Sequence, residues 1–467
     1  MTMASYSKKE LFETRPVKES LRAMAVPTII AQLINLVYNM VDAFFIGRTG
    51  NSYMMAATTV TLTLTLLNVA FANLFGVGGG SHVARLLGQK KHEEAKATAA
   101  FSFYAAILLA LSYSLLIALF KVPVLDFLGA SEMTIDYALQ YTDFVIVIGS
   151  LPALLSMTLA HLLRNAGYSS QASFGLSFGG VLNMFLDPLF MFVLLPKGSE
   201  VKGAAVATLI SNIASLAYML WAYRKASRET SLSMDVQEAM KITPPNRKAV
   251  FSVGVPSAIL TGLFDVANIC VNILAAAHSD LVLAAMGIVM KVERIPNAIN
   301  VGLCQGMLPI VAYNYSSGNH ARMKETIRTA RIWGMIVSFL SILFLELFAR
   351  PVTGIFLAET NGAEEARIVL DFAALFLRIR CLASIFQLLN YHTSFCMQAM
   401  GNGKATMLHA VVRELVFYIP CMFLLDRLFG EIGLASALPV GEALGAIFAL
   451  LLLKHVLKSQ TGEDLSV

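Results

Sequence analysis

Charged residues are scarce in this sequence. Asp, Glu, Lys and Arg make up 14% of its 467 residues, whereas soluble domains carry about 25%. Hydrophobic residues make up 57%. A soluble protein of this length would contain about two or three domains, and too little polar surface remains here to cover them. The composition therefore excludes a soluble multidomain protein.

Alternating segments of about ten residues, which are typical of a membrane β-barrel, are also lacking. Apolar runs of about 20 residues recur instead, and each is long enough to cross roughly 30 Å of hydrocarbon as a helix. We therefore predict an all-α integral membrane protein with twelve transmembrane helices. The predicted spans cover residues 24–47, 54–80, 97–120, 140–162, 170–195, 204–223, 251–276, 281–309, 331–348, 371–397, 406–425 and 433–456.

Sequence motifs for catalysis or for a structural metal are absent. No HExxH or GxSxG occurs, and "GNGKAT" at 401–406 lacks the first Gly and the Ser or Thr of a phosphate loop. The five cysteines all lie inside apolar spans, which indicates small buried side chains and neither a disulfide framework nor a zinc site. We expect neither an enzyme nor a resident cofactor.

Positive residues cluster in alternate loops. If the N-terminus is cytoplasmic, the inside segments hold most of the 35 Lys and Arg residues, including those of 85–96, 224–248 and 322–331. Basic residues concentrate on the cytoplasmic loops of membrane proteins. We predict a multi-pass protein of a bacterial plasma (inner) membrane with both termini in the cytoplasm. The net charge of +5 then reflects topology and not nucleic-acid binding.

Short patterns recur in the same order along the chain. "AVP" at 25–27 matches "GVP" at 254–256, "FLDP" at 185–188 matches "FYIP" at 417–420, and "GAAVAT" at 203–208 matches "GLASAL" at 433–438. Both copies would hold an even number of spans and share one orientation, so we predict two six-helix bundles related by a parallel internal repeat, a plan that suits alternating access. The predicted layout is a cytoplasmic arm at 1–23, an N-terminal bundle at 24–223, a cytoplasmic linker at 224–249, a C-terminal bundle at 250–457 and a cytoplasmic tail at 458–467.

Two acids interrupt the apolar spans of the first half. Asp42 and Asp187 each lie about 18 residues beyond the inner end of a span, so both are roughly 27 Å from the inner surface. A charge at membrane depth costs about 2.5–3.5 kcal/mol and therefore needs a reason. Polar residues accompany the two acids on these and neighbouring spans: Gln32, Asn35, Tyr38, Asn39, Asn183, Thr208 and Asn212.

Carboxylates beside amide and hydroxyl oxygens could hold a proton or a hard cation. They could equally form a solvated helix end or a structural hydrogen-bond network. The repeat has Val271 and Ile419 at the equivalent positions, so the scaffold folds without acids there. Pro27, early in the first span, could be a hinge that responds to protonation of Asp42, or it could form a static kink.

The spans of the second half also carry charges. One interpretation is a second ion or substrate site facing the cleft between the bundles, made of Asp265, Glu293, Arg294 and Arg378, which would favour anionic or zwitterionic groups. The other interpretation is a set of mutual ion pairs that lock the bundle. The remaining charges in these spans are Lys291, Arg380, Arg413 and Glu414.

Six further motifs lie between residues 39 and 324: "NMVDAFFIGRTG", "GGGSHVARLLGQKKHEEA", "LRNAG", "NMFLDPLF", "GAAVAT" and "GLCQGMLPIVAYNYSSGNHARMK". Together they resemble the multidrug and toxic compound extrusion (MATE) family. The resemblance implies a secondary antiporter that exports bulky, cationic or amphipathic compounds in exchange for protons or sodium ions.

Within that family the paired acids resemble the bacterial DinF-like branch more than the NorM-like branch. The resemblance implies a coupling site for H⁺ or Na⁺ at Asp42, Asn183, Asp187 and Thr208. The substrate path is then expected to include Gln32, Asn35, Tyr38, Asn39, Ser177 and Asn212. In the NorM-like branch the coupling acids lie in the C-terminal bundle, and Asp265 is near such a position.

The expected partners are small-molecule drugs or toxic organic compounds and the lipid bilayer. We expect a monomer that binds no nucleic acid and uses no cofactor beyond the coupling ion. An alternative is a flippase for a lipid-linked sugar or an amphipathic anion, which the arginines at 294, 378 and 380 favour. A passive channel, which would show no uphill movement, is a further alternative.

Overall fold

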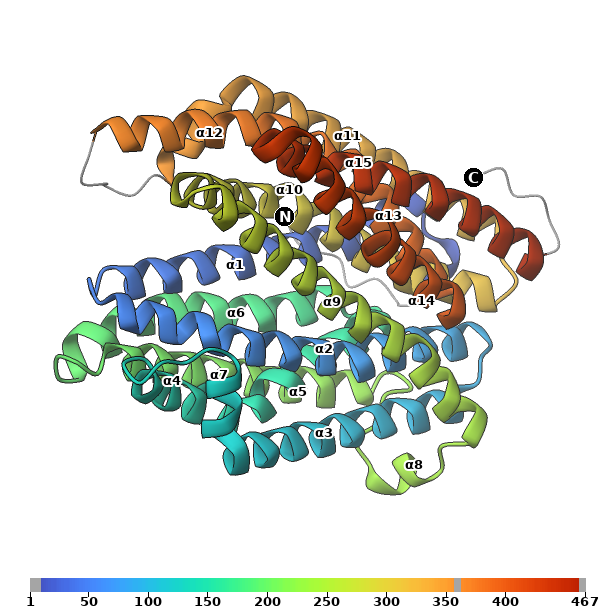
Figure 1. The fold of residues 1–467 in the computed structure, drawn as a ribbon. Coiled ribbons are helices and arrows are strands. Elements are labelled where there is room, and N and C mark those ends of the chain that lie inside the picture. Colours follow the sequence, from blue (N-terminus) through green and yellow to red (C-terminus); the bar gives the residue numbers. More distant parts are fainter. Residues whose placement is uncertain (1–9, 357–362, 462–467) are drawn as a thin grey trace.

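The computed structural model describes residues 10–356 and 363–461, whose regular elements are α-helices and short π-helical segments (Figure 1). The first part of the chain forms η1 Glu10–Thr14, α1 Val17–Gly47, α2 Ser52–Gly88, α3 His92–Phe127, α4 Ile135–Thr142, η2 Asp143–Ile148, α5 Ser150–Asn165, α6 Ser169–Leu189, η3 Phe190–Leu194 and α7 Glu200–Ser227. The remainder forms α8 Val236–Met240, α9 Pro244–His278, α10 Asp280–Ser316, α11 His320–Ile355, α12 Ala363–Cys381, α13 Ala383–Ala399, α14 Gly403–Val411, η4 Val412–Tyr418 and α15 Ile419–Thr461.

The helices account for the predicted spans. In the described part of the chain, nine helices are long and apolar enough to cross a membrane, and the bent pair Ile135–Ile148 and Ser150–Asn165 makes a tenth. One of the nine, Gly403–Gln460, contains two predicted spans, because the backbone breaks at Gly430 with a φ of 61° that glycine adopts readily. The tenth predicted span, 371–397, corresponds to the last part of α12 and to α13, and α12 is the more polar because it carries charges in its first and last turns. The all-α membrane fold is confirmed, with nine to twelve candidate spans.

Several helices are longer than their predicted spans. The structure extends α3 from His92 to Phe127, whereas the apolar run covers only 97–120. Hydropathy marks the part of a helix that meets hydrocarbon, and the helix continues through the more polar residues at the membrane surface. Side-chain caps fix some of these ends: Asn51 accepts hydrogen bonds from the backbone of α2, and Thr243 accepts one from the backbone of α9.

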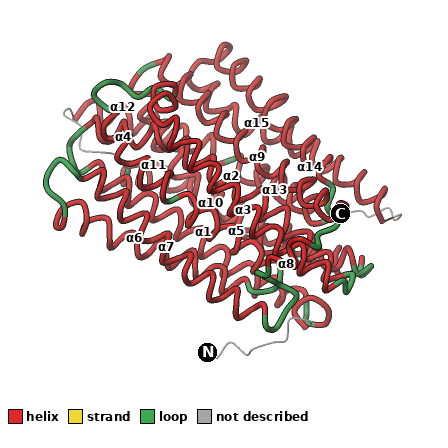
Figure 2. The backbone as a smooth tube through the Cα atoms, turned by 90° about the horizontal axis from the view of Figure 1, so that it is seen from below, coloured by secondary structure: helices red, strands yellow, loops and turns green. Residues whose placement is uncertain are grey.

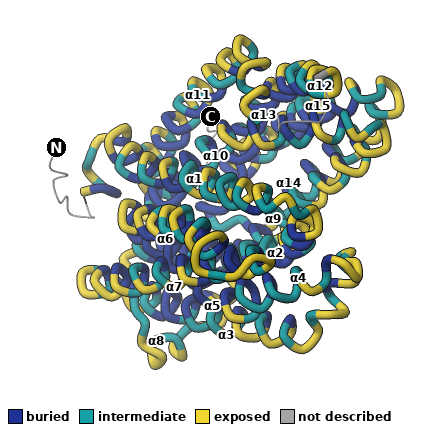
Figure 3. The backbone as a smooth tube through the Cα atoms, turned by 90° about the vertical axis from the view of Figure 1, so that its left-hand side faces the viewer, coloured by how far each residue is buried: buried dark blue, intermediate teal, exposed yellow. Residues whose placement is uncertain are grey.

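Large apolar side chains cover much of the outer surface, where Figure 3 shows exposed positions along the outward faces of the helices. Leu108 and Leu119 of α3 are each 68% exposed, and Leu347 of α11 is 66% exposed. Extensive apolar exposure is unfavourable in water and indicates contact with lipid. The outer faces of the helices therefore form the surface that the bilayer covers.

Helices from the two halves of the chain form two neighbouring groups. In Figure 1, α1 to α7 lie in the lower group and α10 to α15 in the upper group, while α9 crosses beside α2. Figure 2 shows the same helices from below, running alongside one another. The halves meet where α1 and α2 contact α9 and α10. The predicted boundaries of the arm, bundles, linker and tail stay predictions.

Glycines allow this close contact between the halves. A Cβ added to Gly254 of α9 would collide with the backbone carbonyl oxygen of Leu74 in α2. A Cβ on Gly302 of α10 would lie 2.7 Å from the Cα of Ile29 in α1. The helices therefore touch backbone to backbone, as small residues permit in membrane proteins.

Among the described residues, a buried core that both halves share lies at one end of the molecule. Leu11, Phe12 and Leu457 belong to one buried cluster that also includes residues of α1, α10 and α13. We call this the terminal end. Towards the opposite end, the far end, one cluster around Tyr141 belongs to the first half and a separate one around Val271 belongs to the second half.

Hydrogen bonds also join the halves at the terminal end. One guanidinium nitrogen of Arg85 in α2 donates to the backbone carbonyls of Gln398 and Ala399, each at 3.1 Å. The hydroxyl of Ser316 in α10 donates to the carbonyl of Arg85 at 2.7 Å. These bonds link α2 to the C-terminal turn of α13 and to α10, which stabilises the closed terminal end.

Candidate functional site

The candidate ion site lies in the first half. Asn183 and Asp187 are one turn apart on α6, and the amide nitrogen of Asn183 donates to Asp187 Oδ1 at 2.9 Å and to Thr208 Oγ1 of α7 at 3.4 Å. Asp187 is fully buried, and Asp42 of α1 is close enough to act on it electrostatically. The four residues predicted for the ion site therefore lie together. We call them the first-half site.

Three oxygens of the first-half site are buried without a hydrogen-bond partner among the described residues. They are Asp42 Oδ1, Asp187 Oδ2 and Asn183 Oδ1. Buried polar atoms in native proteins nearly always have a partner, so each exception needs an explanation. A proton shared by the acids or a hard cation bound by oxygen atoms would satisfy these acceptors. The donor set fits either ligand.

Two tyrosines complete the surroundings of the acids. The ring of Tyr38 packs closely over Gly180 of α6, where a Cβ would lie 3.0 Å from the ring. Tyr141 of α4 is only 9% exposed and interacts electrostatically with Asp42 and Asp187. Tyr141 was not predicted, because span four is divided into α4, η2 and α5 and the sequence does not reveal which of its faces meets α1 and α6.

The residues predicted for the substrate path differ in their surroundings. Asn35 and Asn39 are exposed, and the amide nitrogen of Asn39 donates to the carbonyl of Asn35 at 2.6 Å. Gln32 reaches the second half, where its amide nitrogen donates to Gln305 Oε1 at 3.1 Å. The other predicted path residues, Tyr38, Ser177 and Asn212, are half-buried.

A central cavity of about 220 Å³ lies between the halves. Its lining includes Asn73 from α2 and, from the second half, Asp265, Gln305, Tyr391, Phe395 and Arg413. Asn73 also donates a hydrogen bond to Thr261 across the cavity at 3.1 Å. An apolar cavity with a few polar groups is typical of a small-molecule site.

The four residues predicted for a second site are brought together only in part: Arg294 acts electrostatically on Asp265, whereas Arg378 lies apart beside Glu346. Asp265 lines the central cavity, whereas Glu293 forms a two-bond ion pair with Arg380 at 2.9 and 2.6 Å. Arg294 is exposed and lines a smaller pocket with Glu293. Arg378 is more than half exposed and lies 4.0 Å from Glu346. The pairing of Glu293 with Arg380 follows the alternative interpretation, in which the charges lock the bundle.

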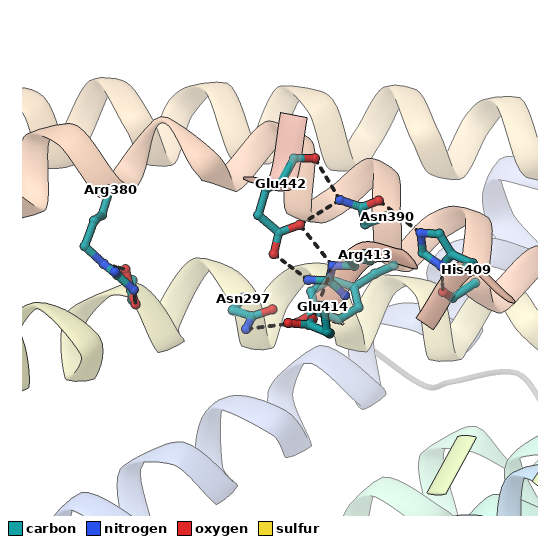
Figure 4. Close-up of polar contacts among 10 residues, drawn as sticks. Asn297, Arg380, Asn390, His409, Arg413, Glu414 and Glu442 are labelled. Atoms are coloured by element: carbon teal, nitrogen blue, oxygen red, sulfur yellow. Dashed lines mark hydrogen bonds and ion pairs between the residues drawn. The ribbon is translucent and has the colours of Figure 1, made fainter. Parts of the chain in front are cut away.

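A buried charge cluster lies beside the central cavity (Figure 4). Arg413 of η4 donates to Glu442 of α15 at 3.0 and 2.6 Å and lies 3.6 Å from Glu414. All three side chains are at most 2% exposed. Glu442 was not singled out from the sequence, although an acid inside the apolar run 433–456 is the signal that drew attention to Asp42.

The sequence pattern of the MatE family matches this chain twice, over residues 27–189 and 256–424. The multidrug export protein MepA of Staphylococcus haemolyticus is 29% identical over 458 residues, which cover 98% of this chain and 97% of that protein. MepA of Staphylococcus aureus strain MRSA252 is 27% identical, with 97% of each chain covered.

A solved structure described as the outward-facing conformation of a multidrug resistance MATE family transporter has a TM-score of 0.89 to this chain. It is 20% identical and the match covers 98% of this chain and 99% of that one, so the likeness concerns the fold. The double match of the family pattern agrees with the predicted internal repeat.

Proposed function

The chain belongs to the MatE family, and we propose that it is an ion-coupled multidrug exporter that works by alternating access. Relatives that match nearly its full length are multidrug export proteins. The observation that carries the proposal is the combination of a cavity between the halves with a separate, buried acid site in the first half. These are the two binding sites that an antiporter requires.

We infer that the terminal end faces the cytoplasm of a bacterial cell and that this structure is the outward-facing state. The basic loops at 85–96 and 322–331 adjoin the terminal end. Closure there is supported by the shared core around Phe12, and the separate cores support an opening towards the far end. Both termini are then cytoplasmic, and we propose that the monomer is the transporting unit.

The cavity favours organic cations with apolar groups. Asp265 forms no ion pair within 4 Å in the described chain, whereas the charge of Arg413 is compensated by Glu442. Phe264, Tyr391 and Phe395 supply aromatic surface in the same cavity. A carboxylate beside aromatic rings suits an amphipathic cation. This balance argues against the flippase alternative, which would require a free positive charge in the cavity.

We propose that the coupling ion, H⁺ or Na⁺, binds at Asp42, Asn183, Asp187 and Thr208. Binding from outside would neutralise the acids, and release inside would follow when the halves rock. Such coupling requires that drug and ion each bind the two states with different affinity. The presence of the acids in the first half suggests the DinF-like branch.

Uphill efflux from proteoliposomes tests this function. Ethidium is loaded, and a proton gradient or a sodium gradient is imposed separately on the wild type. We expect ethidium to move against its own concentration gradient when one of the two ion gradients is imposed. If neither gradient drives ethidium or another organic cation, the exporter proposal is wrong, and lipid-linked sugars become the compounds to assay.

A further inference from the structure

The buried charge cluster of the second half is the strongest feature that the proposed coupling site does not use (Figure 4). It comprises Arg413 and Glu414 on η4, Glu442 on α15, Asn390 on α13 and His409 on α14. The cluster contains one arginine and two carboxyl groups. One positive charge can compensate only one carboxylate, so the state of the other has to be explained.

Glu442 is the carboxylate that Arg413 compensates. Both of its oxygens accept from the guanidinium, at 3.0 and 2.6 Å, and Oε2 also accepts from the amide of Asn390 at 2.6 Å. Glu414 is placed differently. Its Oε1 lies 3.6 Å from the guanidinium, and its Oε2 is buried without a hydrogen-bond partner among the residues that the structure describes.

The polar side chains around Glu414 form hydrogen bonds with other residues. The amide nitrogen of Asn390 donates to Glu442, so its oxygen faces Nε2 of His409 at 3.1 Å. The other ring nitrogen of His409 pairs with the hydroxyl of Ser394 at 2.7 Å. A neutral His409 satisfies both contacts, as donor to Asn390 and acceptor from Ser394.

The other charged or titratable groups around this part of the cluster are two tyrosines, the ion pair of Arg380 with Glu293, and one acid of the cavity. Tyr418, on the same segment, acts electrostatically on Glu414, and the ring of Tyr391 lies 4.7 Å from the guanidinium carbon of Arg413. Asp265 of α9 lines the cavity that Arg413 also lines. Arg380, which also acts on Tyr418, is already paired with Glu293 through two hydrogen bonds, so an ionised Glu414 would be a buried carboxylate without full compensation, which is unfavourable.

The cluster also lies on the spans that correspond to the first-half site. "FLDP" on α6 matches "FYIP" in the segment of Glu414, and "GAAVAT" on α7 matches "GLASAL" in the segment of Glu442. Residues of α6 and α7 form the first-half site through Asn183 and Thr208. In addition, Val412–Tyr418 is π-helical, a geometry that is found at functional sites more often than elsewhere.

We propose that Glu414 binds an exchangeable proton and is a second proton site, in the half of the molecule opposite to the first-half site. The proton is carried on the Glu414 carboxyl while Arg413 is paired with Glu442. When the O–H bond breaks, the proton leaves to water in the central cavity past Arg413, and both carboxylates then share the guanidinium. The role of this proton in drug exchange rests on the proposed function. The binding of the proton to Glu414 does not.

Infrared difference spectroscopy of the purified full chain tests the proton directly. The Asp42→Asn/Asp187→Asn variant removes the carboxyls of the first-half site, and spectra are compared across a pH titration. We expect a carboxylic-acid C=O band that titrates in this background and is lost on adding Glu414→Gln. Glu346→Gln, a carboxyl-to-amide change on α11 outside the cluster, is the matched control and should keep the band.

Identical titrating bands with and without Glu414 would overturn the proposal. If Glu414→Gln does not fold, Glu414→Asp keeps the carboxyl, and a shifted band supports the proposal while an unshifted one contradicts it. Transport is measured on Glu414→Gln with the first-half acids intact: the number of protons moved per ethidium should fall by one relative to the wild type. A wild type that moves no cation uphill, although the Glu414 band titrates, would overturn the proposed function and support the proton site.

Discussion

The acid sites of the two halves differ in how their charges are balanced. In the first half, Asp42 and Asp187 have amide and hydroxyl neighbours and no arginine or lysine ion pair in the described structure. In the second half, Arg413 is hydrogen-bonded to Glu442 and lies 3.6 Å from Glu414. One half thus carries an acid site without an internal cation, and the other half carries an acid site with one.

This difference indicates which site needs an ion from outside the protein. Acids without an internal cation must bind a proton or a metal cation to be stable at membrane depth. In the second half, Arg413 already compensates Glu442, so only the carboxyl group of Glu414 needs a proton there. We therefore assign the main coupling role to the first-half site, and the following predictions test that contrast.

Removing the internal cation should have the largest effect. Arg413→Met leaves Glu442 buried without its positive partner, and breaking a buried ion pair costs about 3–5 kcal/mol. We expect a large fall in the free energy of unfolding, measured by denaturant titration in detergent. Arg413→Met/Glu442→Met, which removes both charges, should recover most of the loss. If Arg413→Met is as stable as the wild type, Arg413 does not compensate the charge of Glu442.

Removing the first-half acids should abolish coupling without unfolding the protein. Asp42→Asn or Asp187→Asn keeps the side-chain shape and removes the charge, so we expect ion-driven ethidium efflux to fall on the order of a hundredfold, at the upper end of typical coupling energies. The thermal unfolding temperature should be unchanged or higher, because an uncompensated buried charge is lost. Glu346→Gln should transport normally. Normal pumping by both acid variants would contradict the assignment.

Adding side-chain volume to the contact between the halves should destabilise the protein at the terminal end and should be tolerated beyond it. Gly254→Ala forces a Cβ against the Leu74 backbone, and overpacking costs about 1–3 kcal/mol. Gly262→Ala is the matched control on the same helix, because nothing lies within 4 Å of its Cβ. We expect only Gly254→Ala to lower the unfolding temperature. Equal effects of the two substitutions would show that the halves are not in close contact near Gly254.

The smallest effect should come from the amide that orients the acid. Asn183→Ala removes the hydrogen bonds to Asp187 and Thr208, and loss of such a supporting partner weakens ion binding by about tenfold or more. The ion concentration that gives half-maximal efflux measures this change. Ser215→Ala removes a buried hydroxyl of α7 outside the site and should leave that concentration unchanged. An unaltered value for Asn183→Ala would remove Asn183 from the ion site.

Much of the fold was predictable because lipid imposes strong constraints on sequence. Every membrane crossing needs a long apolar helix, so span number and order follow from hydropathy. Helix ends were less predictable, as α3 shows, because helices continue into polar surface regions. The broken fourth span and the π-helical segments at 143–148 and 412–418 have no comparable signal in the sequence.

Parts of the site were predictable from charge alone. Asp42 and Asp187 stand out because charges are rare at membrane depth, and spacing along α6 indicates that Asn183 accompanies Asp187. Contacts between distant spans were harder to predict, because they depend on how each helix is rotated. Tyr141 near Asp42, and Glu442 paired with Arg413, are examples of such contacts.

The central claim is that drug and ion compete through the first-half site. The most direct test is to add ethidium to purified protein in weakly buffered solution and to record the protons released, with and without Na⁺. For the wild type we predict proton release, or a Na⁺-dependent loss of ethidium affinity, and neither effect in Asp42→Asn/Asp187→Asn. If the double variant released as many protons and responded to Na⁺ as the wild type does, coupling would reside elsewhere and the central claim would be contradicted.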